Sequence, residues 1–167
     1  MRYKDLIIKE NDSEHKETLK RTGFWGNQGA GVLFVSKNAR TVLLNHRSNK
    51  VEQPGTWGTW GGAIDNNEDP VEAAIREASE ESGQTIDKSQ MKRAYVFTDE
   101  KTGFKYYNFF VVFQKEFSPR IPKKHAWETQ GWGWFGLDDL PSPLHFGAKA
   151  LLSDSKSRKL LMNIFHG

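Results

Sequence analysis

The stretch that decides the fold runs from Gly62 to Gly83 and reads GAIDNNEDPVEAAIREASEESG. Its second half carries the local signals of a helix with both ends defined. Asp69 is a residue type that caps helix N-termini, and Pro70 suits the first helical position. Gly83 suits the left-handed conformation in which many helices end. The sequence therefore predicts a helix over residues 70–82.

Three carboxylates, Glu77, Glu80 and Glu81, lie within little more than one turn of this helix. Like charges at neighbouring helical positions destabilise a helix, so a positive partner is expected, most simply a divalent cation. The three glutamates flank an apolar stripe, which places them at the edge of the buried face. Arg76 lies four residues from both Glu72 and Glu80, and we expect it to pair with one of them and to orient a carboxylate.

This stretch resembles the signature of the Nudix hydrolases, the Nudix box, which would cover residues 62–84 here. The box is a loop–helix–loop that binds divalent metal and the diphosphate of a nucleotide derivative. The match consists of Gly62, Glu68 and the run REASEESG at residues 76–83. Every charged and glycine position of the signature is present. Gln84 departs from it, because the family usually carries an aliphatic residue there, and this puts a packing contact in doubt rather than the metal site.

The resemblance implies a function for several side chains. Glu77, Glu80 and Glu81 would bind Mg²⁺ or Mn²⁺, the hard cations that oxygen ligands select. Glu80 would be a further ligand or the catalytic base. Gly62 and Arg76 would lie among the substrate-binding residues.

The resemblance also implies an α/β fold of the Nudix type, an α/β/α sandwich in which a mixed β-sheet packs against the box helix and the C-terminal helices. Alternating or apolar runs predict the strands of this sheet at residues 30–36, 41–46, 57–63, 93–98, 106–113 and 132–135. Helical segments are expected at residues 142–152 and 155–165. The domain would cover residues 23–167, preceded by a flexible arm over residues 1–22.

Four residues outside the box are further candidates. Arg47 follows a predicted strand, and its planar fork suits a diphosphate, although an exposed surface arginine is an equal alternative. Trp57 and Trp60 could stack on a base or pack in the core. Glu128 resembles the loop glutamate that some family members use as an extra metal ligand or as the general base.

The histidines offer no separate metal site. His46, His125 and His145 lack the spacing of zinc ligands and are expected to be surface or capping groups. The chain also has no cysteine, which removes disulfides and thiolate ligands.

Composition narrows the classes of function. The net charge is +3 over 167 residues, and the basic residues are dispersed, so the sequence does not favour nucleic acid as a partner. The apolar run near the N-terminus is too short for a signal peptide or a membrane span. We therefore expect a cytoplasmic protein with a nucleotide-derivative substrate and no membrane partner. The resemblance is compatible with a homodimer.

The expected function is a metal-dependent hydrolase that cleaves a diphosphate bond in a nucleoside diphosphate linked to another moiety. One alternative is a pyrophosphohydrolase acting on RNA 5′ ends, which would require Lys123 and Lys124 to converge with the basic residues at 156–159. A second alternative is a nucleotide-sensing module that keeps the box for binding alone. The sequence does not identify the nucleotide.

Overall fold

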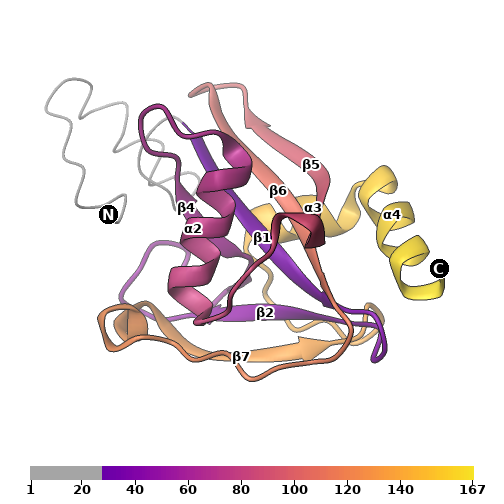
Figure 1. Cartoon of the computed structure of the whole chain (residues 1–167). Helices are drawn as coiled ribbons and strands as arrows, with labels where there is room; N and C mark the ends of the chain where they lie inside the picture. The colour runs from indigo at the N-terminus through magenta and orange to yellow at the C-terminus, as the bar shows by residue number, and fades with distance from the viewer. Residues whose placement is uncertain (1–27) are drawn as a thin grey trace, which may run out of the picture.

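The computed structural model describes residues 28–167, which form a mixed β-sheet with helices on both faces (Figure 1). Helix α2 (Pro70–Ser82) has the bounds that its end signals predict. The other helices are α3 (Phe146–Ser153) and α4 (Ser155–His166). Two short 3-10 helices, η2 (Lys88–Gln90) and η3 (Lys123–Glu128), lie in the connections.

The sheet is built around a central parallel pair. Its strands are β1 (Gln28–Ser36), β2 (Thr41–Arg47), β3 (Trp57–Gly58), β4 (Trp60–Ala63), β5 (Met91–Asp99), β6 (Phe104–Phe113) and β7 (Thr129–Phe135). The order along the main path is β3-β2-β1-β6-β5, while β4 pairs with β1 and β7 with β2. Strands β1 and β6 run parallel and all other pairs are antiparallel.

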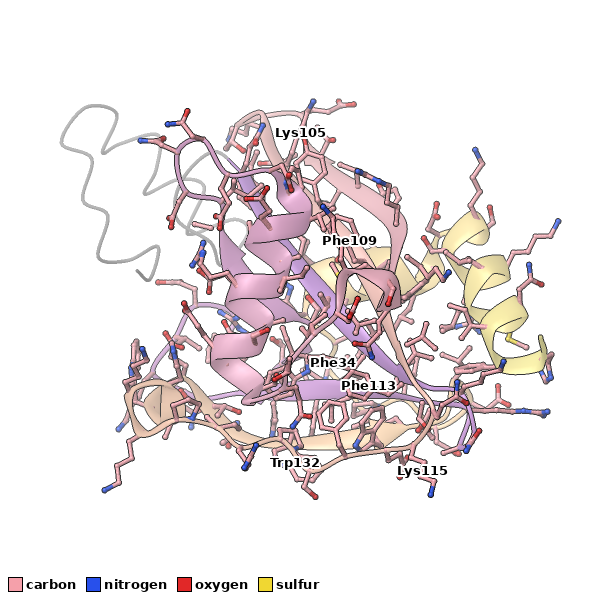
Figure 2. All side chains as sticks on the ribbon, viewed as in Figure 1. Phe34, Lys105, Phe109, Phe113, Lys115 and Trp132 are labelled. Carbon is pink, nitrogen blue, oxygen red and sulfur yellow. The ribbon has the colours of Figure 1, made fainter. Side chains whose placement is uncertain are left out.

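Side chains of the central strands alternate between two cores. On β1, Val32 and Phe34 point into the layer beneath α2, whereas Leu33 and Val35 point into the layer beneath α3 and α4. This alternation follows from the two-residue period of a strand. Figure 2 labels Phe34 and Phe113 in the α2-facing layer, where their rings meet edge to face at 5.9 Å. The predicted α/β/α sandwich is confirmed.

Glycines on the paired strands β1 and β4 allow a close approach of Tyr106 where the chain enters the box. Gly31 on β1 lies opposite Gly61 on β4, and the ring of Tyr106 from β6 packs over both. A Cβ atom on either glycine would overlap the Tyr106 hydroxyl. Only glycine therefore lets the tyrosine pack this closely, which fixes where β4 delivers the chain into the loop and helix that follow.

The C-terminal helical region differs from the expectation in one respect. Helix α3 begins at Phe146 instead of Ser142. The backbone before it pairs with Trp57, because the Trp57 N–H donates to Pro143 O at 3.0 Å and the His145 N–H donates to Trp57 O at 2.8 Å. These hydrogen bonds replace the first helical turn that the sequence suggested.

The structure bears differently on the predicted N-terminal arm and on the expected absence of a membrane span. The proposed arm at residues 1–22 and the start of the domain at residue 23 lie outside the described residues. Within residues 28–167, no helix has the length and apolar composition needed to cross a membrane.

Candidate active site

Helix α2 is held at both ends by local contacts. The Asp69 carboxylate accepts a hydrogen bond from the Glu72 N–H at 2.9 Å, and Gly83 adopts a left-handed φ of 72°. The Gly83 N–H returns to Ser79 O at 3.0 Å. These bonds satisfy groups that a helix otherwise leaves open at its ends. The box glutamates therefore occupy a helix with a fixed length and phase.

Glu77 is the most buried of the three box glutamates, with only 3% of the residue exposed. Its carboxylate lies against Gly62 of β4, where a Cβ atom would come within 2.7 Å of Cδ and Oε2. Burial raises the pKa of Glu77 to about 7, although the neighbouring Arg76 opposes the rise. The charge of Glu80, which is itself half-buried, adds to the rise.

Arg76 ties the loop before the helix to Glu77. Its Nε and Nη2 atoms donate to the two oxygens of Glu68, each at 2.9 Å, in a bidentate pair. Its Nη1 donates to Glu77 Oε1 at 2.9 Å, and Nη2 also reaches Ala63 O at 3.2 Å and Asp65 Oδ2 at 3.4 Å. The predicted orienting role is supported, but the partners are Glu68 and Glu77 rather than Glu72 or Glu80. The Arg76 fork is thus engaged by protein groups, and its predicted contact with substrate stays a prediction.

A pocket of about 50 Å³ lies beside the C-terminal half of α2. We call it the carboxylate pocket. Its polar wall is made by Asn45, Arg47, Thr59, Glu81, His125, Glu128 and Thr129. The structure thus brings Glu81 of the box and Glu128 of the η3 segment, remote in sequence, to one cavity. Glu77 and Glu80 are not among the residues that line it.

The segment that carries Glu128 is anchored at two points. Near its start, the Arg120 N–H donates to Ser82 O at the end of α2, at 2.8 Å. At its end, the Ser48 hydroxyl donates to Trp127 O at 2.7 Å and the Ser48 N–H donates to Glu128 O at 2.9 Å. The backbone of Glu128 is therefore fixed relative to both α2 and β2.

Arg47 lies between the carboxylate pocket and a second, aromatic pocket. Its guanidinium donates to Glu52 O from Nε at 3.0 Å and from Nη2 at 2.5 Å. The aromatic pocket is lined by Phe97, Phe104, Tyr106 and Phe146, and it shares Arg47 and Thr59 with the first. The ring of Phe97 meets that of Phe146 edge to face at 5.1 Å.

The two candidate tryptophans pack within the protein. Trp60 is fully buried, and its indole N–H donates to Leu43 O at 3.2 Å. Trp57 stacks on His46 with ring centroids 4.1 Å apart and meets Phe135 edge to face. Both rings are engaged by protein groups, which favours the core-packing alternative, although Trp60 also lines the carboxylate pocket and Trp57 is only half-buried.

Comparison with known proteins identifies the family. A family model described as the NUDIX domain matches residues 27–154. The chain belongs to the Nudix family. A Mycobacterium tuberculosis protein, named provisionally as 8-oxo-dGTP diphosphatase 3, is 33% identical over 136 residues, which cover 76% of this chain and 61% of that protein. The chain therefore spans about three-fifths of the length of this relative.

Solved structures agree with this membership. The Nudix hydrolase RenU of Mycobacterium smegmatis has a TM-score of 0.63 at 26% identity, with 84% of this chain and 89% of that chain covered. A MutT Nudix hydrolase of Burkholderia pseudomallei has a TM-score of 0.60 at 28% identity, with 77% and 97% covered. Both carry the Nudix sandwich that the sheet and helices of this chain form.

The donor chemistry of this Nudix site fits a hard divalent cation. Among residues 28–167, no three His, Cys, Asp or Glu side chains converge closely enough to enclose an ion by themselves. Mg²⁺, however, commonly takes only one or two protein carboxylates and completes its octahedron with waters and substrate phosphates. The carboxylates of the box helix supply such oxygens. The absence of a side chain at Gly62 leaves room for one of them, that of Glu77.

Sequence reasoning missed part of the pocket wall. His125 was expected to be a surface or capping group, yet only 3% of it is exposed and it lines the carboxylate pocket. Its spacing of three residues from Glu128 was the available signal. Asn45 and Thr59 also line the pocket, and no motif marks them. His145 does cap a helix, since its Nδ1 accepts from the Gly147 N–H at 3.0 Å.

Gly62→Ala is expected to lower both stability and the function of the site. The added methyl group would overlap the buried Glu77 carboxylate, so the carboxylate must shift and its contact with Arg76 would be disturbed. We expect a loss of about 1–3 kcal/mol in the free energy of unfolding, as for other overpacked sites. Chemical denaturation and a metal titration measure the two effects. Gly131→Ala is the matched control because its Cβ meets no atom within 4 Å. Equal behaviour of the two variants would contradict the assignment.

Proposed function

We propose that this protein is a metal-dependent hydrolase that cleaves the diphosphate bond of a nucleoside diphosphate linked to another moiety. The observation that carries the proposal is the convergence of Glu81 and Glu128 on one pocket, beside a box helix whose Glu77 is locked between Gly62 and Arg76. Family membership over residues 27–154 supports the same reaction class.

The proposed roles follow from what hydrolysis of a diphosphate requires. Glu77, Glu80 and Glu81 supply the oxygen donors for Mg²⁺ or Mn²⁺, which would neutralise charge on the non-bridging phosphate oxygens. Glu128 lines the same pocket as Glu81 and is the proposed general base, which takes the proton of the attacking water. Glu80, the other candidate base, does not line the pocket. Attack at phosphorus then breaks the bond to the bridging oxygen, and the leaving phosphate departs with that oxygen.

Arg47 and the aromatic pocket are the proposed places for the rest of the substrate. Because Arg47 lines both pockets, its guanidinium is the proposed phosphate contact. The aromatic pocket has a volume of only about 10 Å³, so a base would enter it only after Phe97 and Phe146 move apart. Flat aromatic surroundings favour stacking of a planar group. The name of the Mycobacterium tuberculosis relative makes a modified purine nucleoside triphosphate the first substrate to test.

The RNA alternative finds less support. It requires Lys123 and Lys124 to share a groove with the basic residues of α4. Lysines 123 and 124 belong to η3 beside β7, whereas α4 lies at the opposite side of the molecule (Figure 1). The sensing alternative is also weakened, because binding alone does not require the second carboxylate, that of Glu128, in the pocket lined by Glu81.

A substrate screen with two matched glutamate variants tests the proposal. The purified protein with Mg²⁺ or Mn²⁺ is assayed for phosphate products against 8-oxo-dGTP, ordinary nucleoside triphosphates, dinucleoside polyphosphates, ADP-ribose, nucleotide sugars and 5′-triphosphate RNA. Glu81→Gln is expected to lose roughly 100-fold or more in kcat/KM, since a metal ligand contributes several kcal/mol to the transition state. Glu72→Gln, an exposed change in the same helix, should leave activity unchanged.

Each result of the screen has a defined meaning. One preferred substrate, lost in Glu81→Gln and kept in Glu72→Gln, supports the hydrolase. Hydrolysis that survives Glu81→Gln removes the metal role of this residue. Binding of nucleotides without hydrolysis of any of them would favour the sensing module instead.

A further inference from the structure

We propose that His125 is a positioning residue, which holds the Glu128 carboxylate toward the carboxylate pocket. This inference rests on the proposed function, in which Glu128 is the general base. It assigns a role to a buried imidazole that the sequence alone placed among surface or capping groups.

The geometry places His125 directly beside Glu128. The two residues stand three apart within η3, and His125 Nδ1 lies 3.5 Å from Glu128 Oε2. The backbone N–H of His125 donates to Pro122 O at 2.9 Å, so the backbone that carries the ring is itself part of the helical turn. Both side chains line the carboxylate pocket, together with Glu81.

The backbone anchors do not by themselves set the rotamer of the Glu128 side chain. Ser48 fixes the carbonyl groups of Trp127 and Glu128, but a glutamate side chain keeps several rotatable bonds beyond its backbone. A buried ring at one side of the carboxylate limits those rotations. A contact of 3.5 Å is longer than a good hydrogen bond, and catalytic contacts commonly shorten when substrate binds.

Two conservative variants separate positioning from packing. An asparagine side chain carries its amide nitrogen two bonds from Cβ, as histidine carries Nδ1, whereas a glutamine side chain carries it three bonds away, as histidine carries Nε2. His125→Asn should therefore retain kcat within about threefold, and His125→Gln should lower kcat roughly 10-fold with little change in KM, since misplaced catalytic groups lose rate. Thermal denaturation of both variants is measured alongside.

The same substitutions in a Glu128→Gln background complete the experiment. If His125 acts through Glu128, His125→Gln should change kcat less than about twofold once Glu128 has lost its charge, because coupled residues are not additive. A structural role would produce the same loss in both backgrounds.

Several outcomes would overturn the inference. Equal losses in the Asn and Gln variants, or an undiminished loss in the Glu128→Gln background, would show that the ring acts by packing alone. Full activity of Glu128→Gln would remove the base that His125 is inferred to position, while hydrolysis itself stood. Absence of hydrolysis by the unaltered protein would instead reject the proposed function, and the inference with it.

Discussion

Replacing Glu77 with glutamine is expected to remove most of the hydrolysis and, without metal, to make the folded protein more stable. The loss of a carboxylate proposed to bind the metal should lower kcat/KM roughly 100-fold or more. Stability should move in the opposite direction because this residue is 3% exposed and burial disfavours the charged form of its carboxylate. Arg76 would keep its bidentate pair with Glu68 and would not be left alone in the site.

The gain in stability should depend on pH in a defined direction. Burial raises the pKa of Glu77 from 4.5 to about 7, so the folded protein keeps a proton that the unfolded chain releases between these values. Stability from this group is fully present below the lower value and is lost as pH rises through the higher one. The advantage of Glu77→Gln should therefore grow between about pH 5 and about pH 8, to at most about 3 kcal/mol.

Chemical denaturation in a chelator measures this advantage at each pH, with Glu72→Gln as the exposed control. Addition of Mg²⁺ should reverse the order, because an ion that binds only the folded protein stabilises the unaltered chain more than the variant. A variant that is less stable than the unaltered protein at every pH would reject the argument from burial. A variant that retained normal kcat/KM would reject the metal role.

Local sequence was sufficient for the part of the fold that carries the box. Helix α2 was predictable because Asp69, Pro70 and Gly83 specify its ends without help from distant residues. Most strands followed from apolar runs, but the predicted strand at residues 57–63 is divided at Thr59 into β3, which pairs with β2, and β4, which pairs with β1. The start of α3 was not predictable, because it depends on hydrogen bonds between Trp57 and a segment about 85 residues later in the chain.

The site shows the same division between local and distant information. The spacing of Glu77, Glu80 and Glu81 marks the box on sequence alone. The partners of Arg76 could not be read from helical spacing, since Glu68 reaches it only when the loop before α2 folds back. The burial of Trp60 and His125 could not be predicted either, because both residue types occur in cores and at ligand sites.

Replacing Arg76 with methionine is expected to produce the largest loss of stability of any single change in the site. The guanidinium contacts carboxylates of Glu68, Glu77 and Asp65, and the side chain of Glu77 is only 4% exposed. Removing one partner of a buried ion pair leaves the other charge without compensation, which typically destabilises by about 3–5 kcal/mol. The partial exposure of Arg76 and Glu68 reduces this expectation to about 2–4 kcal/mol.

Two further variants test whether the uncompensated charge on Glu77 causes that loss. Arg76→Met combined with Glu77→Gln should recover much of the free energy of unfolding, since the double variant buries no unpaired carboxylate at this position. Arg76→Lys should fall between the unaltered protein and Arg76→Met, because an ammonium keeps the charge but not the fork that engages both Glu68 oxygens. If the double variant were no more stable than Arg76→Met alone, the loss would come from the loop contacts with Glu68 and Ala63 instead. The recovered double variant should still be inactive, because it lacks the Glu77 carboxylate that is proposed to bind the metal.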